Sequence, residues 1–138
     1  MKATVAYLLA LISLLLAPSL WAAEWVPPGF ESLNEPQVTL VDVNYGGYVL
    51  TTALVRFTQE ELRFLEPAAL VAELPDLLDP AAVEQLLDRD FPTNAASICR
   101  SGFQLDCGVL TPEGIEIIFD RDRLALSLFL APDLLQVR

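Results

Sequence analysis

The two cysteines of the chain, Cys99 and Cys107, are the residues whose type and spacing most directly suggest chemistry. Both lie in the stretch CRSGFQLDCG, residues 99–108. Thiol-exchange sites have the spacing C-x-x-C at a helix N-terminus, which lowers the pKa of the thiol, and this stretch does not have that spacing. A structural zinc site needs about four ligands, and the sequence has no histidine and no third cysteine. The pattern therefore predicts a structural disulfide that closes a short loop.

Two Asp-Arg-Asp triplets are the next candidates. One contains Asp88 and Asp90, and the other contains Asp120 and Asp122. Paired carboxylates act as acid and base when their pKa values differ, and their oxygens bind calcium. An arginine separates each pair, and Asp is favoured in turns, so we expect structural roles for both. The sequence also lacks a histidine base and a Gly-x-Ser-x-Gly motif, and it predicts no enzyme, no metal and no cofactor.

Residues 1–23 predict a secretory signal peptide. Lys2 precedes an apolar run over residues 3–17, and the small residues Ala22 and Ala23 follow as the cleavage region. The run is shorter than the roughly 20 residues of a membrane-spanning helix. Cleavage after either alanine delivers the chain to an oxidising compartment, where a disulfide persists.

Acidic side chains dominate the charge. The 138 residues include 19 acids and 8 lysines or arginines, which gives a formal net charge of −11 at pH 7. This charge repels nucleic-acid phosphates and anionic lipid surfaces, so it argues against both and favours a basic protein partner. The length suits one domain with a modest core, to which the disulfide adds about 2–3 kcal/mol by restricting the unfolded chain.

The first part of the mature chain predicts an arm followed by a hairpin. Residues 24–37 contain three prolines, which withhold backbone donors, so an extended arm is expected. Its apolar side chains either pack on the domain, as most terminal arms do, or dock on a partner. Residues 38–57 predict two strands joined at Gly46 and Gly47. We expect these glycines to form a turn that requires positive φ, and not a phosphate-binding loop.

The remaining elements complete a small α+β domain over residues 38–138. Residues 58–67 fit either a capped helix or a half-buried strand, and the strand is favoured. Short helices are expected after Glu66-Pro67 and Asp79-Pro80, a third capped turn at Thr111-Pro112, and a strand-turn-strand over 115–130. The predicted architecture is therefore β-hairpins at both ends, short helices between them and one disulfide loop. The expected buried faces are Leu70, Val71 and Leu74; Val83, Leu86 and Leu87; and Leu124, Leu126, Leu128 and Leu130.

Five stretches, taken in order, resemble a known family. They are VPPGFESL, VDVNYGGYVL, DPAAVEQLL, FPTNAASIC and CGVLTPEGIEIIFDRDRLALSLFLAPDLL. Together they are similar to the periplasmic N-terminal domain of outer-membrane fimbrial ushers, in particular the branch that serves the alternate chaperone pathway. The similarity covers most of residues 26–135. It implies a domain that precedes a pore-forming β-barrel and is the first docking site for complexes of a periplasmic chaperone with a pilin subunit.

The resemblance also implies where the partner binds and where the protein is located. Apolar contacts are expected from the arm residues Trp25, Val26, Pro27, Phe30 and Leu33. The expected location is the periplasm, next to the outer membrane if the domain is part of a full usher. Full ushers continue into barrel, plug and C-terminal domains, whereas this sequence ends at Arg138, so these residues are not expected to form a translocation pore by themselves. The alternative is a small secreted structural or inhibitory protein-interaction domain with a packed arm.

Overall fold

The computed structural model describes residues 27–29 and 35–137. The chain divides into two units, Met1–Phe30 and Glu31–Arg138. The described part of the first unit is the exposed segment Pro27–Gly29, which turns at Pro28 and Gly29. The second unit contains every helix and strand described below.

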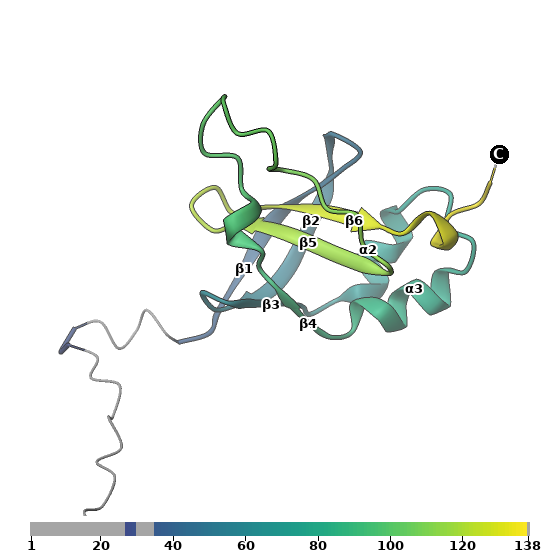
Figure 1. Cartoon of the computed structure of the whole chain (residues 1–138). Coiled ribbons are helices and arrows are strands. Elements are labelled where there is room, and N and C mark those ends of the chain that lie inside the picture. Colours follow the sequence, from purple (N-terminus) through teal and green to yellow (C-terminus); the bar gives the residue numbers. More distant parts are fainter. Residues whose placement is uncertain (1–26, 30–34, 138) are drawn as a thin grey trace, which may run out of the picture. The chain divides into compact units, whose positions relative to one another are not determined.

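Six strands of the second unit form one sheet in the order β4-β3-β2-β1-β6-β5. Two short α-helices, α2 and α3, lie near one end of this sheet (Figure 1). The fold is therefore α+β and rich in strands. The elements are β1 (Gln37–Tyr45), β2 (Tyr48–Phe57), β3 (Glu61–Phe64), α2 (Pro67–Glu73), α3 (Pro80–Leu87), β4 (Asp90–Pro92), η2 (Ala95–Ser97), β5 (Ile115–Asp120), β6 (Ala125–Leu130) and η3 (Pro132–Leu134).

The two predicted hairpins are present, and a parallel pairing joins them. β1 and β2 are antiparallel, as are β5 and β6. β1 also pairs with β6 in parallel, with Val43 opposite Leu126. The first and last hairpins thus become neighbours in the middle of the sheet, although about 80 residues separate them in sequence.

The sheet is nearly closed, because the edge strand β5 bonds to the segment around β4. The Phe119 amide donates to the Thr93 carbonyl at 2.8 Å, and the Asn94 side-chain amide donates to the Ile117 carbonyl at 2.8 Å. The guanidinium of Arg89 donates to the Ile115 carbonyl at 2.7 Å. These bonds occupy backbone groups that an open edge would offer to another strand.

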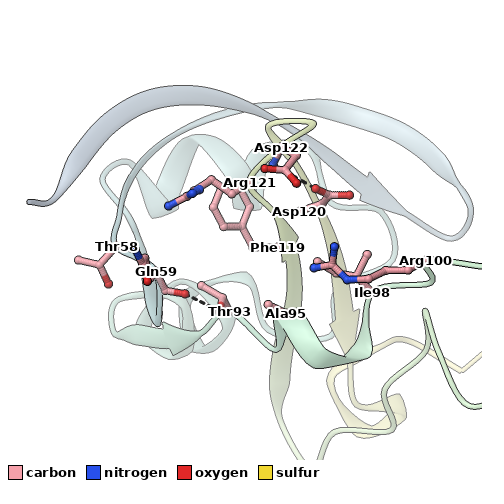
Figure 2. Close-up of a pocket in the computed structure, with 10 residues that line it drawn as sticks. All are labelled: Thr58, Gln59, Thr93, Ala95, Ile98, Arg100, Phe119, Asp120, Arg121 and Asp122. Atoms are coloured by element: carbon pink, nitrogen blue, oxygen red, sulfur yellow. Dashed lines mark hydrogen bonds between the residues drawn. The ribbon is translucent and has the colours of Figure 1, made fainter. Parts of the chain in front are cut away.

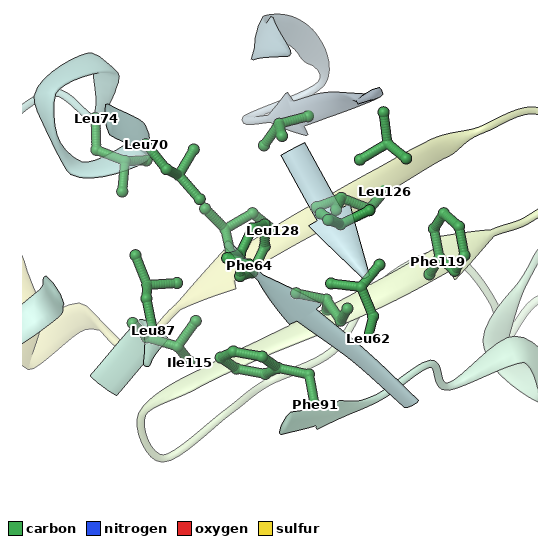
Figure 3. Close-up of a cluster of buried hydrophobic side chains, with 14 of the residues drawn as sticks. Leu62, Phe64, Leu70, Leu74, Leu87, Phe91, Ile115, Phe119, Leu126 and Leu128 are labelled. Atoms are coloured by element: carbon green, nitrogen blue, oxygen red, sulfur yellow. The ribbon is translucent and has the colours of Figure 1, made fainter. Parts of the chain in front are cut away.

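The hydrophobic core fills the inner face of this curved sheet. Two edge-to-face aromatic pairs lie in it, Phe57 with Phe119 at 5.0 Å between centroids and Phe64 with Phe91 at 5.7 Å. Figure 3 shows that the helices add Leu70, Leu74 and Leu87 to the same cluster. The remaining core members include Val41, Val43, Val55, Leu62, Val71, Leu77, Val83, Ile115, Ile117, Leu126 and Leu128.

Both helices begin at the predicted acid-proline pairs, although only one acid caps its helix. The Asp79 carboxylate accepts a hydrogen bond from the Ala82 amide at 3.1 Å, whereas Glu66 makes no side-chain cap bond. Proline at the first helical position costs nothing, because that amide has no intrahelical partner. The C-terminal segment then holds the linker between the helices, since the Leu78 amide donates to the Leu134 carbonyl.

The ambiguous segment 58–67 contains the strand β3, as the favoured interpretation predicted. The Thr58 hydroxyl accepts bonds from the Glu60 and Glu61 amides at 3.3 and 3.2 Å. The cap-like signal was therefore real, but it closes the turn between β2 and β3 and does not begin a helix.

Three local predictions were wrong, those for Thr111-Pro112, Leu86 and Leu124, and one strand was missed. No capped helical turn forms at Thr111-Pro112, a stretch without regular structure. β4 was not anticipated, because three residues are too few to show alternation and pairing with β3 creates the strand. Leu86 is exposed on α3, and Leu124 lies in the β5–β6 turn with φ of 49° instead of continuing the buried face of β6.

Candidate functional site

The base of the disulfide loop lies against the outer face of the last hairpin. Cys99 and Cys107 are bonded, with their Cα atoms 5.1 Å apart. The Gly108 amide donates to the Ser97 carbonyl at 2.7 Å, which fixes the base of the loop. Ile118, on the outer face of β5, is only 6% exposed, and it lines a small cavity together with the loop base. The base of the loop that the disulfide closes thus covers part of the outer face of the sheet.

The tip of the loop presents two large apolar side chains to solvent. Phe103 is 96% exposed and Leu105 is 95% exposed. Between them, the Gln104 side-chain oxygen accepts bonds from the Arg100 and Ser101 amides at 2.7 and 3.2 Å. Since Gln104 is turned toward the loop's own backbone, its two neighbours face outward. The sequence reasoning treated this loop as structural only and missed these residues; two hydrophobic residues inside a polar cysteine loop were the available signal.

The glycines at the β1–β2 turn have the predicted conformation. Gly46 and Gly47 have φ of 62° and 88°, values that residues with a Cβ adopt only with strain. A groove of about 440 Å³ lies beside this turn, and β6 and the segment Gly108–Leu110 also line it. Burial raises the pKa of the adjacent Tyr45 phenol, with smaller contributions from Tyr48 and Asp76.

The first Asp-Arg-Asp triplet has structural contacts. Arg63 of β3 pairs with Asp88 at 2.7 Å and with Asp90 at 3.5 Å. Arg89 lies over the Phe91 ring at 4.0 Å and contacts Glu116 at 3.5 Å. The triplet therefore holds β4 beside β3 and helps to close the sheet.

The second triplet forms the β5–β6 turn. One Asp120 carboxylate oxygen accepts bonds from the Asp122 and Arg123 amides at 3.1 and 3.3 Å, which is a typical turn-forming arrangement of Asp. Within residues 27–29 and 35–137, no group of three or more metal-ligating side chains comes together.

A shallow pocket of about 290 Å³ adjoins this turn (Figure 2). Arg100 and Arg121 line it together with Asp120 and Asp122, so its positive and negative charges are balanced. The buried Thr93 hydroxyl already donates to the Gln59 carbonyl at 3.3 Å. The residues that line the pocket include no histidine or thiol to serve as base or nucleophile.

An apolar patch lies on the outer face of the first strands, and we call it the β1 patch: Val38, Leu40, Leu54 and Leu65. Val38 and Leu40 are 58% and 59% exposed. Leu40 is paired with Leu54 across the β1–β2 ladder, and the Leu65 amide donates to the Leu54 carbonyl at 3.0 Å. Val38 and Leu40 of the patch belong to β1, the strand that immediately follows the arm in sequence.

Of the predicted arm contacts, only Pro27 lies in the described part of the chain, where it is exposed. Trp25, Val26, Phe30 and Leu33 lie outside the described residues. Their predicted role in partner binding therefore remains a prediction.

Comparisons of the chain with protein-family models, curated proteins and solved structures gave no match. In the described part of the chain, no helix is both long and apolar enough to cross a membrane.

Proposed function

We propose that this protein is a binding module that recruits periplasmic chaperone–pilin complexes for pilus assembly at the outer membrane. In this role the domain carries out no reaction itself. It captures the complex in the periplasm and presents it for secretion by an usher barrel.

The β1 patch is the observation that carries the proposal. Apolar patches exposed beside polar surroundings typically mark protein-binding surfaces. The patch continues in sequence from an arm that is itself rich in apolar residues, so one partner can contact both. Proline restricts the free arm, which lowers the entropy lost when it docks.

The charge of the chain supports a basic partner. A formal charge of −11 attracts a basic chaperone surface and accelerates its encounter with the domain. The order of the sequence stretches similar to usher N-terminal domains supports the choice of a chaperone–pilin complex over other basic proteins.

Calorimetric titration with a purified complex of an alternate-branch chaperone and its pilin tests the proposal. We expect saturable binding, which Trp25→Ala or Phe30→Ala weakens by about 1–3 kcal/mol each, as for buried aromatic anchors. The melting temperature of both variants should equal that of the wild type. If the arm is packed on the domain instead, both substitutions will lower the melting temperature and the wild type will not bind the complex.

A matched pair of variants tests the β1 patch itself. Leu40→Ala should weaken binding, because Leu40 lies in the patch. Leu78→Ala removes a similarly exposed leucine from the linker between α2 and α3, and it should bind like the wild type. Equal affinities for the two variants would remove the patch from the binding surface.

A further inference from the structure

The exposed tip of the disulfide loop is a second surface without an assigned role. Phe103 and Leu105 are more exposed than any residue of the β1 patch. Large apolar side chains standing almost wholly in water are a poor fit to a purely structural loop, whose stability they do not assist. The loop is also at the hairpin-turn end of β1, since its base shares a cavity with Asn44, whereas the arm precedes the opposite end at Gln37.

The loop is organised before any partner binds. The Cys99–Cys107 bond closes it, and the Gln104 side chain ties its first half through two backbone amides. In Figure 1 this loop, between η2 and β5, projects away from the sheet. A projecting, covalently closed loop loses little conformational freedom on binding, so its apolar tip is suited to enter a cavity.

The small area of the tip limits the binding energy that it can provide. One aromatic side chain buries about 150–250 Å², and a leucine adds less, whereas a stable interface buries about 800 Å² on each partner. The tip therefore cannot hold a complex alone and must add to a contact made elsewhere. The net charge of −11 also opposes pairing with a second copy of the chain or with an anionic bilayer.

We propose that Phe103 and Leu105 form a second anchor, which enters an apolar cavity on the chaperone–pilin complex that the arm and the β1 patch capture. This inference rests on the proposed function and extends it to the far end of β1. The β1 patch and the loop tip then contact separate points on one partner, and the loop fixes the orientation in which the partner is held.

The test uses the double variant Phe103→Ala/Leu105→Ala in the mature chain, titrated with the same purified complex. We expect about tenfold weaker binding, mostly through faster dissociation, with an unchanged melting temperature. Val137→Ala is the control, because Val137 is 98% exposed and lies away from the loop in sequence; it should bind like the wild type. A second variant, Cys99→Ser/Cys107→Ser, keeps the apolar tip but frees the loop, and it should also bind more weakly.

The outcomes separate the two proposals. If the wild type binds and the Phe103→Ala/Leu105→Ala variant binds equally well, the second anchor is refuted while the recruiting function stands. If the wild type does not bind, both are refuted. Sedimentation that shows a wild-type dimer lost in the double variant would assign the tip to self-association instead. Flotation of the wild type, but not the variant, with phosphatidylethanolamine–phosphatidylcholine vesicles would assign it to a membrane.

Discussion

Gly108 supports a quantitative prediction about the base of the disulfide loop. Its φ is +77°, and a Cβ placed on it would lie 2.9 Å from the Cys99 sulfur, which the disulfide prevents from moving aside. A left-handed φ costs a residue with a Cβ about 1–2 kcal/mol, and an enforced steric overlap about 1–3 kcal/mol. Gly108→Ala should therefore lower the free energy of unfolding by about 2–5 kcal/mol, the sum of the two contributions.

Two other glycines separate these contributions. Gly47 has φ of +88° and no neighbouring atom within 4 Å, so Gly47→Ala should cost about 1–2 kcal/mol from the backbone alone. Gly114 has neither a positive φ nor a close neighbour, and Gly114→Ala should change stability by less than about 0.5 kcal/mol. Urea unfolding followed by far-ultraviolet circular dichroism measures all three, with equal m-values as the check on two-state behaviour.

The disulfide-free background provides the decisive comparison. In Cys99→Ala/Cys107→Ala the obstructing sulfur is gone, so the cost of Gly108→Ala should fall to that of Gly47→Ala. The steric reasoning is refuted if Gly108→Ala costs no more than Gly47→Ala when the disulfide is present. It is equally refuted if the excess cost persists after the sulfur has been removed.

Two further predictions concern the closure of the sheet and its response to pH. Arg89→Ala should lower the free energy of unfolding in urea by about 2–4 kcal/mol, because it removes a charged hydrogen bond to the Ile115 carbonyl and the contact with the Phe91 ring. Glu116→Gln removes only the partly exposed ion pair with Arg89 and should lower it by less than about 1 kcal/mol. Similar costs for the two variants would contradict this assignment. Because the pKa of Tyr45 is raised above its ordinary value of 10.0, the folded state keeps a proton that the unfolded state loses, so stability should fall as pH rises past about 10. Tyr45→Phe should flatten this dependence between pH 9 and 11, and an unchanged slope would contradict it.

The local elements of the fold were largely predictable. The β1–β2 hairpin follows from alternating residues and a glycine pair, and both helices follow from an acid before proline. These signals depend on neighbours within a few residues, so the chain encodes them locally. Leu86 and Leu124 show the limit, because periodicity places a leucine on a face but does not establish that another element covers it.

The candidate binding surfaces were predictable only in part. The arm was predicted as a binding surface from its apolar residues and prolines, and most of it lies outside the described residues. The β1 patch was not predicted, because Val38 and Leu40 are residue types that also occur on the buried face of a strand. Their exposure depends on which side of the sheet the helices and the disulfide loop cover.

The sequence by itself determined an acidic chain with a predicted secretory signal, one disulfide, two hairpins and two short helices. Only the tertiary structure decided that β1 and β6 pair in parallel, that β4 forms, and that Arg89 and Asn94 help to close the sheet. It also decided that Phe103 and Leu105 face water while Ile118 beneath the loop does not. The physical reason is that pairing and burial between distant segments depend on the combined packing of the whole chain, whereas turns, caps and helix starts depend on steric and hydrogen-bonding preferences of adjacent residues.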